Sequence, residues 1–391
     1  MLRDLQGYSE YASPNGPIYL REGSASKNAL KCATIFDCDG VLIDAKLSYN
    51  LAIGKTVSLF MKRCFLFDLK SAYISEEIIY RFRASGGFNN DWDLTYSIIL
   101  WLLSRILHDV PDINDKIDPT DFNGSIKILR SLVSQKETEG LYPEITDSIN
   151  RELLLLADRA DSTGIKSVVV GIPLRPEMIK KITLLLGYPG DYQNSLLVRM
   201  FDEIFYGAVL FKETYGADPI FQTGDGLIKN EKIIVYESTL SKISERVGRK
   251  SIGIASGRSL SSAKFTLKNL LNYFNPTAMF FIEDEARREN PQRLGSTLMD
   301  VGKPSPLSLL KTCLEMGESE FIFYIGDSME DLIMANNAKA YDKRIHFVGV
   351  YSTGLSSLEI QSTMAEKGAY ALIPSVNELP ELMATIGGTK I

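Results

Sequence analysis

Histidine, cysteine and long apolar runs are scarce in this 391-residue sequence. With only two histidines, His108 and His346, the chain is not expected to use a histidine base or a histidine-rich metal site. Its four cysteines form no CxxC pair and no zinc-binding spacing, which suits a reducing cytoplasm better than a disulfide framework. No apolar stretch is long enough to span a bilayer, and the amino-terminal residues lack the apolar core of a signal peptide. We therefore expect a cytoplasmic protein without a membrane partner.

Positively charged residues are also fewer than negatively charged ones. The chain has 43 lysines and arginines against 49 aspartates and glutamates, a formal net charge of −6, and no dense basic tract. This balance argues against nucleic acid as a partner. A hydrophobic content of 45% and a charged content of 24% are ordinary for a soluble globular protein. Because 391 residues exceed what one hydrophobic core usually supports, two domains are expected.

A pair of aspartates follows the most strand-like segment of the chain. The apolar run 32–36 is too short for a helix and favours a buried strand. Asp37, Asp39 and Gly40 come directly after it, at the sheet edge where open α/β folds bind ligands. Two carboxylates this close raise each other's pKa, and a hard cation such as Mg²⁺ would neutralise them. Asp37 could then act as a nucleophile and Asp39 as a general acid and base, although from these residues alone a capped turn is the alternative.

Later strand-like segments alternate with helical ones, which predicts βαβ units and a parallel sheet. The first strand must belong to the same sheet. The sheet domain is therefore expected to be discontinuous, formed by residues 1–45 and 235–391. An irregular arm is expected over 1–30, with one short strand at 18–20. The other expected strands are 250–255, 278–282, 320–325, 345–351 and 371–373, and the helices between them are 260–273, 306–315 and 330–338.

Residues 46–234 are predicted to form one large, mainly helical insertion. Segment 108–142 is polar and is interpreted as a long loop or as a helix–loop interruption. The helix 94–107 is strongly apolar, so it either fills the core of the insertion or packs against a second copy of the chain. The expected helices are 49–67, one opening at Ser75, 94–107, 149–160, 176–186 and 195–206, the last ending at Gly207.

A loop rich in turn-forming residues precedes the apolar helix. It places two amides, Asn89 and Asn90, beside the aromatic Trp92. Flexible backbone with polar and aromatic side chains suits a loop that faces a substrate. The alternative is an ordinary turn whose helix is capped by Asp91 or Asp93.

Residues suited to phosphate or metal follow other predicted strands. Ser256 offers a hydroxyl and a backbone N–H to a phosphate oxygen, and Gly257 and Arg258 come next. Arg258 either assists there or caps the helix. Lys303 precedes a helix that a proline would start, where a cation can neutralise both a carboxylate and a phosphoryl group.

Two further acids, Asp327 and Asp331, lie four residues apart across a strand end and a helix start. Asp327 can reach a metal held by Asp37, and Asp331 can reach it directly or through water. Taken singly, these acids suit any helix start and Lys303 suits any surface. Because all of them follow strands of one expected sheet, together they indicate a single site.

Taken together, these motifs resemble those of the haloacid dehalogenase superfamily of phosphohydrolases. The resemblance rests on 37–42, Ser256, Lys303 and 326–328 with Asp331. It implies a Rossmann-like α/β core with a cap inserted between the first two motifs. A mostly helical cap is typical of the phosphoglycolate phosphatase and β-phosphoglucomutase-like branch, although this insertion is larger and the resemblance is thin over 108–232.

The resemblance also implies a magnesium site and a phosphoaspartyl mechanism. The Asp37 carboxylate, the Asp39 main-chain carbonyl and Asp327 would hold Mg²⁺, with Asp331 as a further ligand. Asp37 would attack phosphorus, and Asp39 would protonate the leaving oxygen and then activate water. Dehalogenases of the superfamily lack the second aspartate, so Asp39 argues for phosphate as the reacting group.

The remaining implied contacts are with the substrate. Ser256 and Lys303 would steady the transferring phosphoryl group. The cap would close over the core and read the leaving group. The expected substrate-binding residues are Gly40, Gly257, Arg258, Asn89, Asn90 and Trp92.

We therefore expect a Mg²⁺-dependent phosphatase, a phosphoric monoester hydrolase, that acts on a small phosphorylated metabolite. A sugar phosphomutase on the same core is one alternative. A phosphonate-cleaving enzyme that uses Lys55 or Lys62 as a Schiff base is another. A binding protein that kept the fold without turnover is the third. The large cap leaves room for a homo-oligomer.

Overall fold

The computed structural model describes residues 5–23, 31–88, 90–107, 116–289, 301–352 and 357–387. The chain divides into two compact units. Unit 1 comprises the described residues within 1–45, 231–289 and 301–387, and unit 2 comprises those within 46–230. The chain thus enters unit 2 at the expected position and returns four residues earlier than expected. The reason is a short ribbon in which β5 (Lys232–Ile233) pairs with β4 (Ile43–Asp44) in unit 1.

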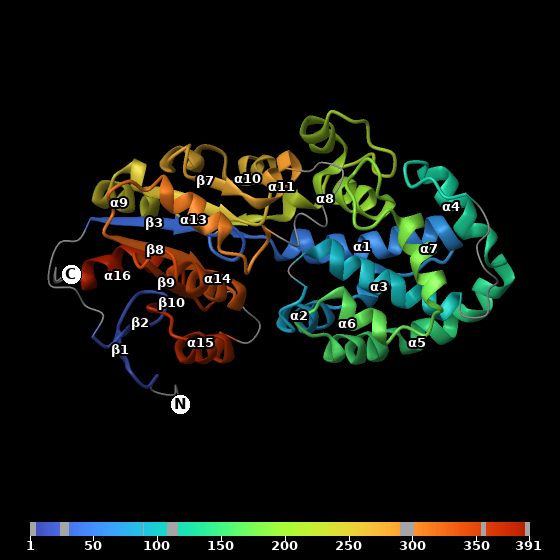
Figure 1. Cartoon of the computed structure of the whole chain (residues 1–391), viewed down its shortest axis with the longest axis horizontal. Coiled ribbons are helices and arrows are strands. Elements are labelled where there is room, and N and C mark those ends of the chain that lie inside the picture. Colours follow the sequence, from blue (N-terminus) through green and yellow to red (C-terminus); the bar gives the residue numbers. More distant parts are fainter. Residues whose placement is uncertain are drawn as a thin grey trace. The chain divides into compact units, whose positions relative to one another are not determined.

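An eight-stranded sheet forms the centre of unit 1 (Figure 1). Its order is β1-β2-β10-β9-β8-β3-β6-β7, and the strands from β10 to β7 are parallel. The predicted α/β class is confirmed. The strands are β1 (Tyr8–Tyr11), β2 (Ile18–Arg21), β3 (Cys32–Phe36), β6 (Ile252–Ser256), β7 (Met279–Phe281), β8 (Phe321–Gly326), β9 (Ile345–Val350) and β10 (Ala371–Ile373).

The central position of β3 follows from its composition. Its neighbours are β8 and β6, so both of its edges are paired. Only apolar and small side chains suit a parallel strand that is covered on both faces, and all of β3 after Cys32 is buried. The last residue of β3 is followed by Asp37, which places that carboxylate at the carboxyl edge of the sheet.

Helices flank the sheet of unit 1 (Figure 1). The expected strand 18–20 is confirmed as β2, but two other expectations for this unit were wrong. The amino-terminal arm is a hairpin, because β1 pairs with β2 and β2 continues the sheet antiparallel to β10. The expected strand 278–282 is shorter, since Ile282 already begins α11. The helices are α9 (Glu237–Val247), α10 (Leu260–Leu267), α11 (Ile282–Glu289), α13 (Leu307–Leu314), α14 (Met329–Lys339), α15 (Ser357–Glu366) and α16 (Leu379–Ile386).

Unit 2 is built from helices. The helix α7 has the expected bounds, and Ser75 caps α2 by accepting the Ile78 amide. The helices are α1 (Lys46–Phe65), α2 (Glu76–Ala84), α3 (Asp91–Ile106), α4 (Phe122–Ser131), α5 (Gln135–Arg159), α6 (Ile165–Val170), α7 (Pro176–Leu186) and α8 (Leu196–Tyr215). Among the described residues, no helix combines the length and apolarity needed to cross a membrane.

Where the structure describes the polar segment 108–142, loop and helix alternate, so the alternative of a helix–loop interruption is confirmed there. The segment contains α4 and the start of α5. In α4, Phe122, Ile126 and Leu129 recur at helical spacing and bury one face, and that spacing outweighs the polar composition around them. His108 lies outside the described residues.

The apolar helix α3 fills the core of unit 2. Nearly all of its side chains are buried within the unit, including those of Leu94, Ile98 and Leu102. The alternative that this helix packs against a second copy of the chain is therefore wrong. The expected end of a helix at Gly207 is confirmed, because Gly207 is non-helical with φ of 74°, but a second helical stretch that was not expected continues α8 to Tyr215.

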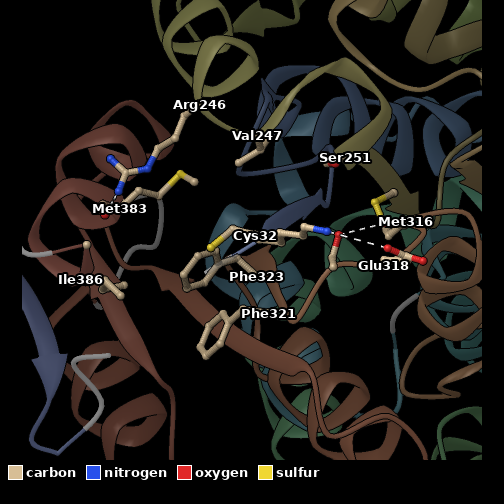
Figure 2. Close-up of a pocket in the computed structure, with 13 residues that line it drawn as sticks. Cys32, Arg246, Val247, Ser251, Met316, Glu318, Phe321, Phe323, Met383 and Ile386 are labelled. Carbon is tan, nitrogen blue, oxygen red and sulfur yellow. Dashed lines mark hydrogen bonds and ion pairs between the residues drawn. The ribbon is translucent and has the colours of Figure 1, made fainter. Parts of the chain in front are cut away.

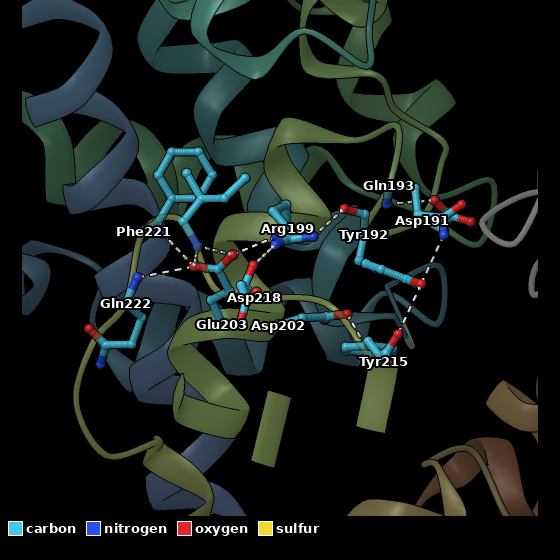
Figure 3. A network of polar contacts seen from close by, with 11 residues as sticks. Asp191, Tyr192, Gln193, Arg199, Asp202, Glu203, Tyr215, Asp218, Phe221 and Gln222 are labelled. Atoms are coloured by element: carbon cyan, nitrogen blue, oxygen red, sulfur yellow. Dashed lines mark hydrogen bonds and ion pairs between the residues drawn. The ribbon is translucent and has the colours of Figure 1, made fainter. Parts of the chain in front are cut away.

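A buried ion pair on α8 organises the segment that follows it (Figure 3). The Nε–H of Arg199 donates to Glu203 at 2.5 Å, and both side chains are buried. The Glu203 carboxylate also accepts the backbone amides of Ile220, Phe221 and Gln222. One carboxylate thereby fixes three successive residues of the loop that leads back to unit 1.

Candidate active site

Asp37 and Lys303 form the centre of the site. The amide of Asp37 continues the sheet by donating to the Ile325 carbonyl at 2.9 Å. Its side chain is buried, and Oδ2 lies 2.8 Å from Nζ of Lys303. The same Nζ lies 2.6 Å from Oδ1 of Asp331. The lysine therefore joins the nucleophile candidate at the end of β3 to an acid on α14, as its predicted neutralising role requires.

Asp331 accepts hydrogen bonds at both of its carboxylate oxygens. Its Oδ1 accepts from Lys303 and from the Tyr324 hydroxyl at 2.6 Å. Its Oδ2 accepts the Ser328 hydroxyl at 2.6 Å and the Ser328 amide at 3.1 Å. Ser328 in turn caps α14 through the Asp331 amide, which completes a capping box. These bonds occupy the usual acceptor positions of the carboxylate, so Asp331 is placed to hold Lys303.

The pKa values of the two acids beside Lys303 are shifted in opposite directions. Burial raises the pKa of Asp37 to about 7, although Lys303 opposes the shift, and Asp331 and Asp39 add to it. Burial also acts to raise the pKa of Asp331, but Lys303, Ser328 and Tyr324 outweigh it and the pKa is lowered. Burial alone would lower the pKa of Lys303, yet the two carboxylates raise it, so the lysine stays protonated.

The donor set fits a divalent cation. One carboxylate oxygen from each of Asp37, Asp327 and Asp331 lies within 4.8 Å of the others. Oδ1 of Asp37 is buried and has no hydrogen-bond partner among the described residues. Oxygen ligands of this kind suit Mg²⁺. Because Asp331 already accepts four hydrogen bonds, Asp37 and Asp327 are the better candidates for direct ligands.

Gly40 allows Asp327 to approach this group. Its φ is +74°, and a Cβ at this position would lie 1.8 Å from Oδ2 of Asp327. No side chain can occupy that space. Gly257, the other glycine of the predicted set, is exposed, and a Cβ there would meet nothing within 4 Å. The fold therefore requires glycine at position 40 but leaves space for a side chain at position 257.

Asp39 lies at the rim of the site. Its side chain is 38% exposed, and its Oδ1 accepts from Nη1 of Arg258 at 3.1 Å. Arg258 is buried and also donates to Glu231 at 2.7 Å and to Ser262 at 3.1 Å. The guanidinium was expected to contact phosphate or cap a helix, and in the structure it binds side chains of unit 1.

Ser256 occupies the end of β6, the strand next to β3. Its hydroxyl is buried beside the Cys38 thiol, and among the described residues no oxygen or nitrogen shares a hydrogen bond with it. Burial raises the pKa of Cys38, which keeps this thiol neutral. A hydroxyl with spare bonding capacity at a strand end suits the predicted role of Ser256.

The candidate substrate residues of unit 2 have structural partners. Asn90 caps α3 by accepting the Trp92 amide at 2.9 Å, so the cap at Asp91 or Asp93 that the alternative of an ordinary turn required is wrong. Trp92 is buried, and its indole N–H donates to Asp202 at 3.2 Å. Both side chains thus support the fold of unit 2, and their contact with a substrate stays a prediction. Asn89 lies outside the described residues.

Neither lysine proposed for a Schiff base has a desolvated environment. Lys55 is exposed on α1. Lys62 is 66% exposed and forms an ion pair with Asp68 at 3.3 Å. A Schiff-base lysine is normally activated by an apolar pocket or a second cation. These environments argue against phosphonate cleavage through either residue.

A hollow of about 440 Å³ lies at the other end of the sheet (Figure 2). It is lined by Cys32 and Phe321, the first residues of β3 and β8, and by apolar side chains that include Met383. Its charged side chains already have partners, since Lys31 forms an ion pair with Glu318 and Arg246 donates a hydrogen bond to the Met383 carbonyl. The hollow therefore adds no group to the carboxylate site.

Sequence reasoning missed two residues that support the site. Tyr324 places a hydroxyl against Asp331 from within β8, and a tyrosine just before the acidic motif in an apolar strand could have signalled this. Glu231 was assigned to the insertion, yet it is fully buried against Arg258 in unit 1. Nothing in its local sequence distinguishes it from a solvated acid.

No family model and no curated protein sequence matches this chain. The solved structures similar to this chain include the following two. One, a crystal structure from the Northeast Structural Genomics Consortium, is 16% identical with a TM-score of 0.56 and covers 92% of this chain and all of its own. The other is phosphatase Tt82 from Thermococcus thioreducens, 19% identical over 85% of this chain and 98% of its own, with a TM-score of 0.44. At these identities the first similarity concerns the fold alone, and the second is too low to support an argument.

Proposed function

We propose that the protein is a Mg²⁺-dependent phosphatase that hydrolyses a small phosphorylated metabolite through an aspartyl-phosphate intermediate. The observation that supports this is the arrangement of Asp37, Lys303 and Asp331 at the carboxyl edge of the central strand. The Asp37 carboxylate is buried, one of its oxygens meets a fixed cation, and the other has no hydrogen-bond partner among the described residues. With a second carboxylate two residues on, this arrangement suits phosphoryl transfer to an aspartate.

The chain's own residues account for both half-reactions. In the first, the Asp37 carboxylate attacks phosphorus, the bond to the leaving oxygen breaks, and Asp39 gives that oxygen a proton. In the second, a water molecule attacks the phosphorus of the aspartyl phosphate and loses its proton to Asp39. Phosphate leaves and the Asp37 carboxylate is restored.

Two further residues stabilise the transferring group. Lys303 is held by Asp331, so its ammonium group can lie beside the phosphoryl oxygens without prior rearrangement. The Ser256 hydroxyl can donate to another of these oxygens. Mg²⁺, held by Asp37 and Asp327, would supply charge neutralisation of the phosphoryl oxygens.

Steady-state hydrolysis tests the proposal. Para-nitrophenyl phosphate and a panel of phosphorylated metabolites are assayed with Mg²⁺ and with EDTA, for the wild type and for Asp37→Asn. We expect Mg²⁺-dependent turnover that Asp37→Asn abolishes. Asp68→Asn is the matched control, because Asp68 is an exposed acid of unit 2 whose side chain pairs with Lys62.

Trapping of the intermediate separates the alternatives. A labelled phosphoenzyme that forms in the wild type and is absent in Asp37→Asn supports the mechanism. Transfer of phosphate between two positions of a sugar bisphosphate, in place of release, would identify a phosphomutase. A folded, metal-loaded protein that hydrolyses no phosphate ester would overturn the proposal and favour a binding protein.

A further inference from the structure

Arg258 joins three side chains around a buried guanidinium. The side chain is fully buried, and each of its nitrogens donates a hydrogen bond. Nη1 binds Asp39 at 3.1 Å, Nη2 binds Glu231 at 2.7 Å, and Nε binds Ser262 at 3.1 Å. A planar guanidinium with all three nitrogens engaged has one orientation, which a lysine could not reproduce.

Glu231 fixes this arrangement from the opposite side. Its carboxylate is fully buried, Oε1 accepts from Arg258, and Oε2 accepts the Thr266 hydroxyl at 2.5 Å. A buried arginine with a single, half-exposed partner would be costly, because its charge would be poorly compensated. Glu231 compensates that charge, so Asp39 can remain at the rim and face a substrate.

Because of its position in the chain, Glu231 connects Arg258 to the segment that returns from unit 2. Glu231 is the first residue of unit 1 after the chain returns from unit 2. Directly after it, β5 pairs with β4, and the Ile234 amide donates to the Leu42 carbonyl at 2.9 Å. The segment that carries Asp39 is therefore bound to the returning segment twice, through the ribbon and through Arg258.

We propose that Arg258 is a positioning residue for Asp39, and that Glu231, through Arg258, makes the orientation of Asp39 depend on the segment that returns from unit 2. The inference rests on the proposed function, because it concerns the acid and base of that reaction. An aspartate that is 38% exposed has several open rotamers, and a bond from an immobile guanidinium selects one. Proton transfer requires that the carboxylate meet the leaving oxygen in one geometry.

The effect of a variant on substrates with different leaving groups distinguishes loss of Asp39 positioning from a general loss of activity. An alkyl phosphate needs a proton on its leaving oxygen, whereas p-nitrophenolate leaves readily without one. If Arg258 positions Asp39, Arg258→Met should lower kcat/KM for an alkyl phosphate by roughly 10²-fold or more, the range for loss of a general acid. The fall for p-nitrophenyl phosphate should be below about tenfold. Arg258→Lys should recover little of the difference, because an ammonium group cannot form the same fork.

Two further variants make the test specific. Glu231→Gln removes the compensating charge without touching Asp39, and it should shift the ratio of the two substrates in the same direction by a smaller factor. Arg344→Met is the matched control, because Arg344 binds Asp342 and the carbonyls of Gly317 and Ser319 in unit 1. It should leave the ratio unchanged. If Arg258→Met fails to fold, Glu231→Gln and Arg258→Lys carry the test.

Amide hydrogen exchange gives a second result that needs no activity. In Glu231→Gln, exchange should accelerate both in 231–235 and in 38–44, where the Gly40 amide donates to Ile43 at 2.8 Å. Acceleration confined to 231–235 would overturn the link. An active wild type whose substrate ratio is unchanged in the Arg258 and Glu231 variants would also overturn it. A wild type that hydrolyses neither ester would instead refute the proposed function, and the exchange data would then decide the inference alone.

Discussion

Replacing Glu203 by glutamine tests how unit 2 holds the loop that follows α8. The carboxylate is fully buried between Arg199 and the amides of residues 220–222. Glutamine keeps the size of the side chain, but it removes the charge and replaces one acceptor oxygen by a donor. The buried guanidinium of Arg199 then loses a charged partner, and at least one backbone N–H faces another donor.

The expected loss is large compared with the stability of an ordinary domain. Breaking a buried ion pair by removing one partner costs about 3–5 kcal/mol. A buried amide left unpaired costs about 1–3 kcal/mol more. Because the same carboxylate makes both interactions, the two figures overlap, and we expect a total of roughly 4–6 kcal/mol for Glu203→Gln.

The tryptophans allow this loss to be measured in unit 2 by itself. The chain has two, Trp92 and Trp101, and both lie on α3. Their fluorescence during urea unfolding therefore reports on unit 2. Glu213→Gln, an exposed change on the same helix, should stay within about 0.5 kcal/mol of the wild type. Equal unfolding midpoints for Glu203→Gln and Glu213→Gln would refute the assigned role of Glu203.

Three other outcomes are expected. Gly40→Ala should abolish Mg²⁺ binding measured by calorimetry, because its Cβ would displace Asp327, whereas Gly257→Ala should bind normally. Burial raises the pKa of Asp93 to about 6 from 3.8, so the free energy of unfolding should fall by roughly 3 kcal/mol as pH rises from about 4 to about 6. In urea unfolding, Asp93→Asn should show a weaker dependence of this free energy on pH. Lys303→Met should lower the free energy of unfolding, followed by circular dichroism, by about 3–5 kcal/mol, because the buried carboxylate of Asp37 loses its cation. An unchanged midpoint would contradict the buried contact.

The strand ends could be predicted because their pattern is local. The buried strand 32–36 is apolar throughout, and an acid follows it, which is enough to place Asp37 at a sheet edge. Parallel strands end at one edge, so Asp37, Ser256 and Asp327 were expected together. The structure brings Asp37 and Asp327 close to each other and places Ser256 at the end of the neighbouring strand.

The elements that were missed depend on contacts between distant parts of the chain. Strand β1 was missed, because its four residues carry little signal of their own and it joins the sheet only through β2, which pairs with β10 about 350 residues later. In α4, the buried face is defined by three apolar residues within a polar stretch. Glu231 could not be predicted for the same reason, because its role depends on a contact with Arg258, which follows in the next βα unit.

Asp37 and Asp331 show why residue type alone does not assign a role. Both are buried aspartates that contact the same lysine nitrogen. Asp331 also accepts from Tyr324 and twice from Ser328, and these donors lower its pKa against the effect of burial. Asp37 keeps Oδ1 without a partner among the described residues, and burial raises its pKa. Because a carboxylate must have an accessible lone pair to attack phosphorus or bind a cation, the donors around each acid suit Asp37 to the proposed reactive role and suit Asp331 to holding Lys303.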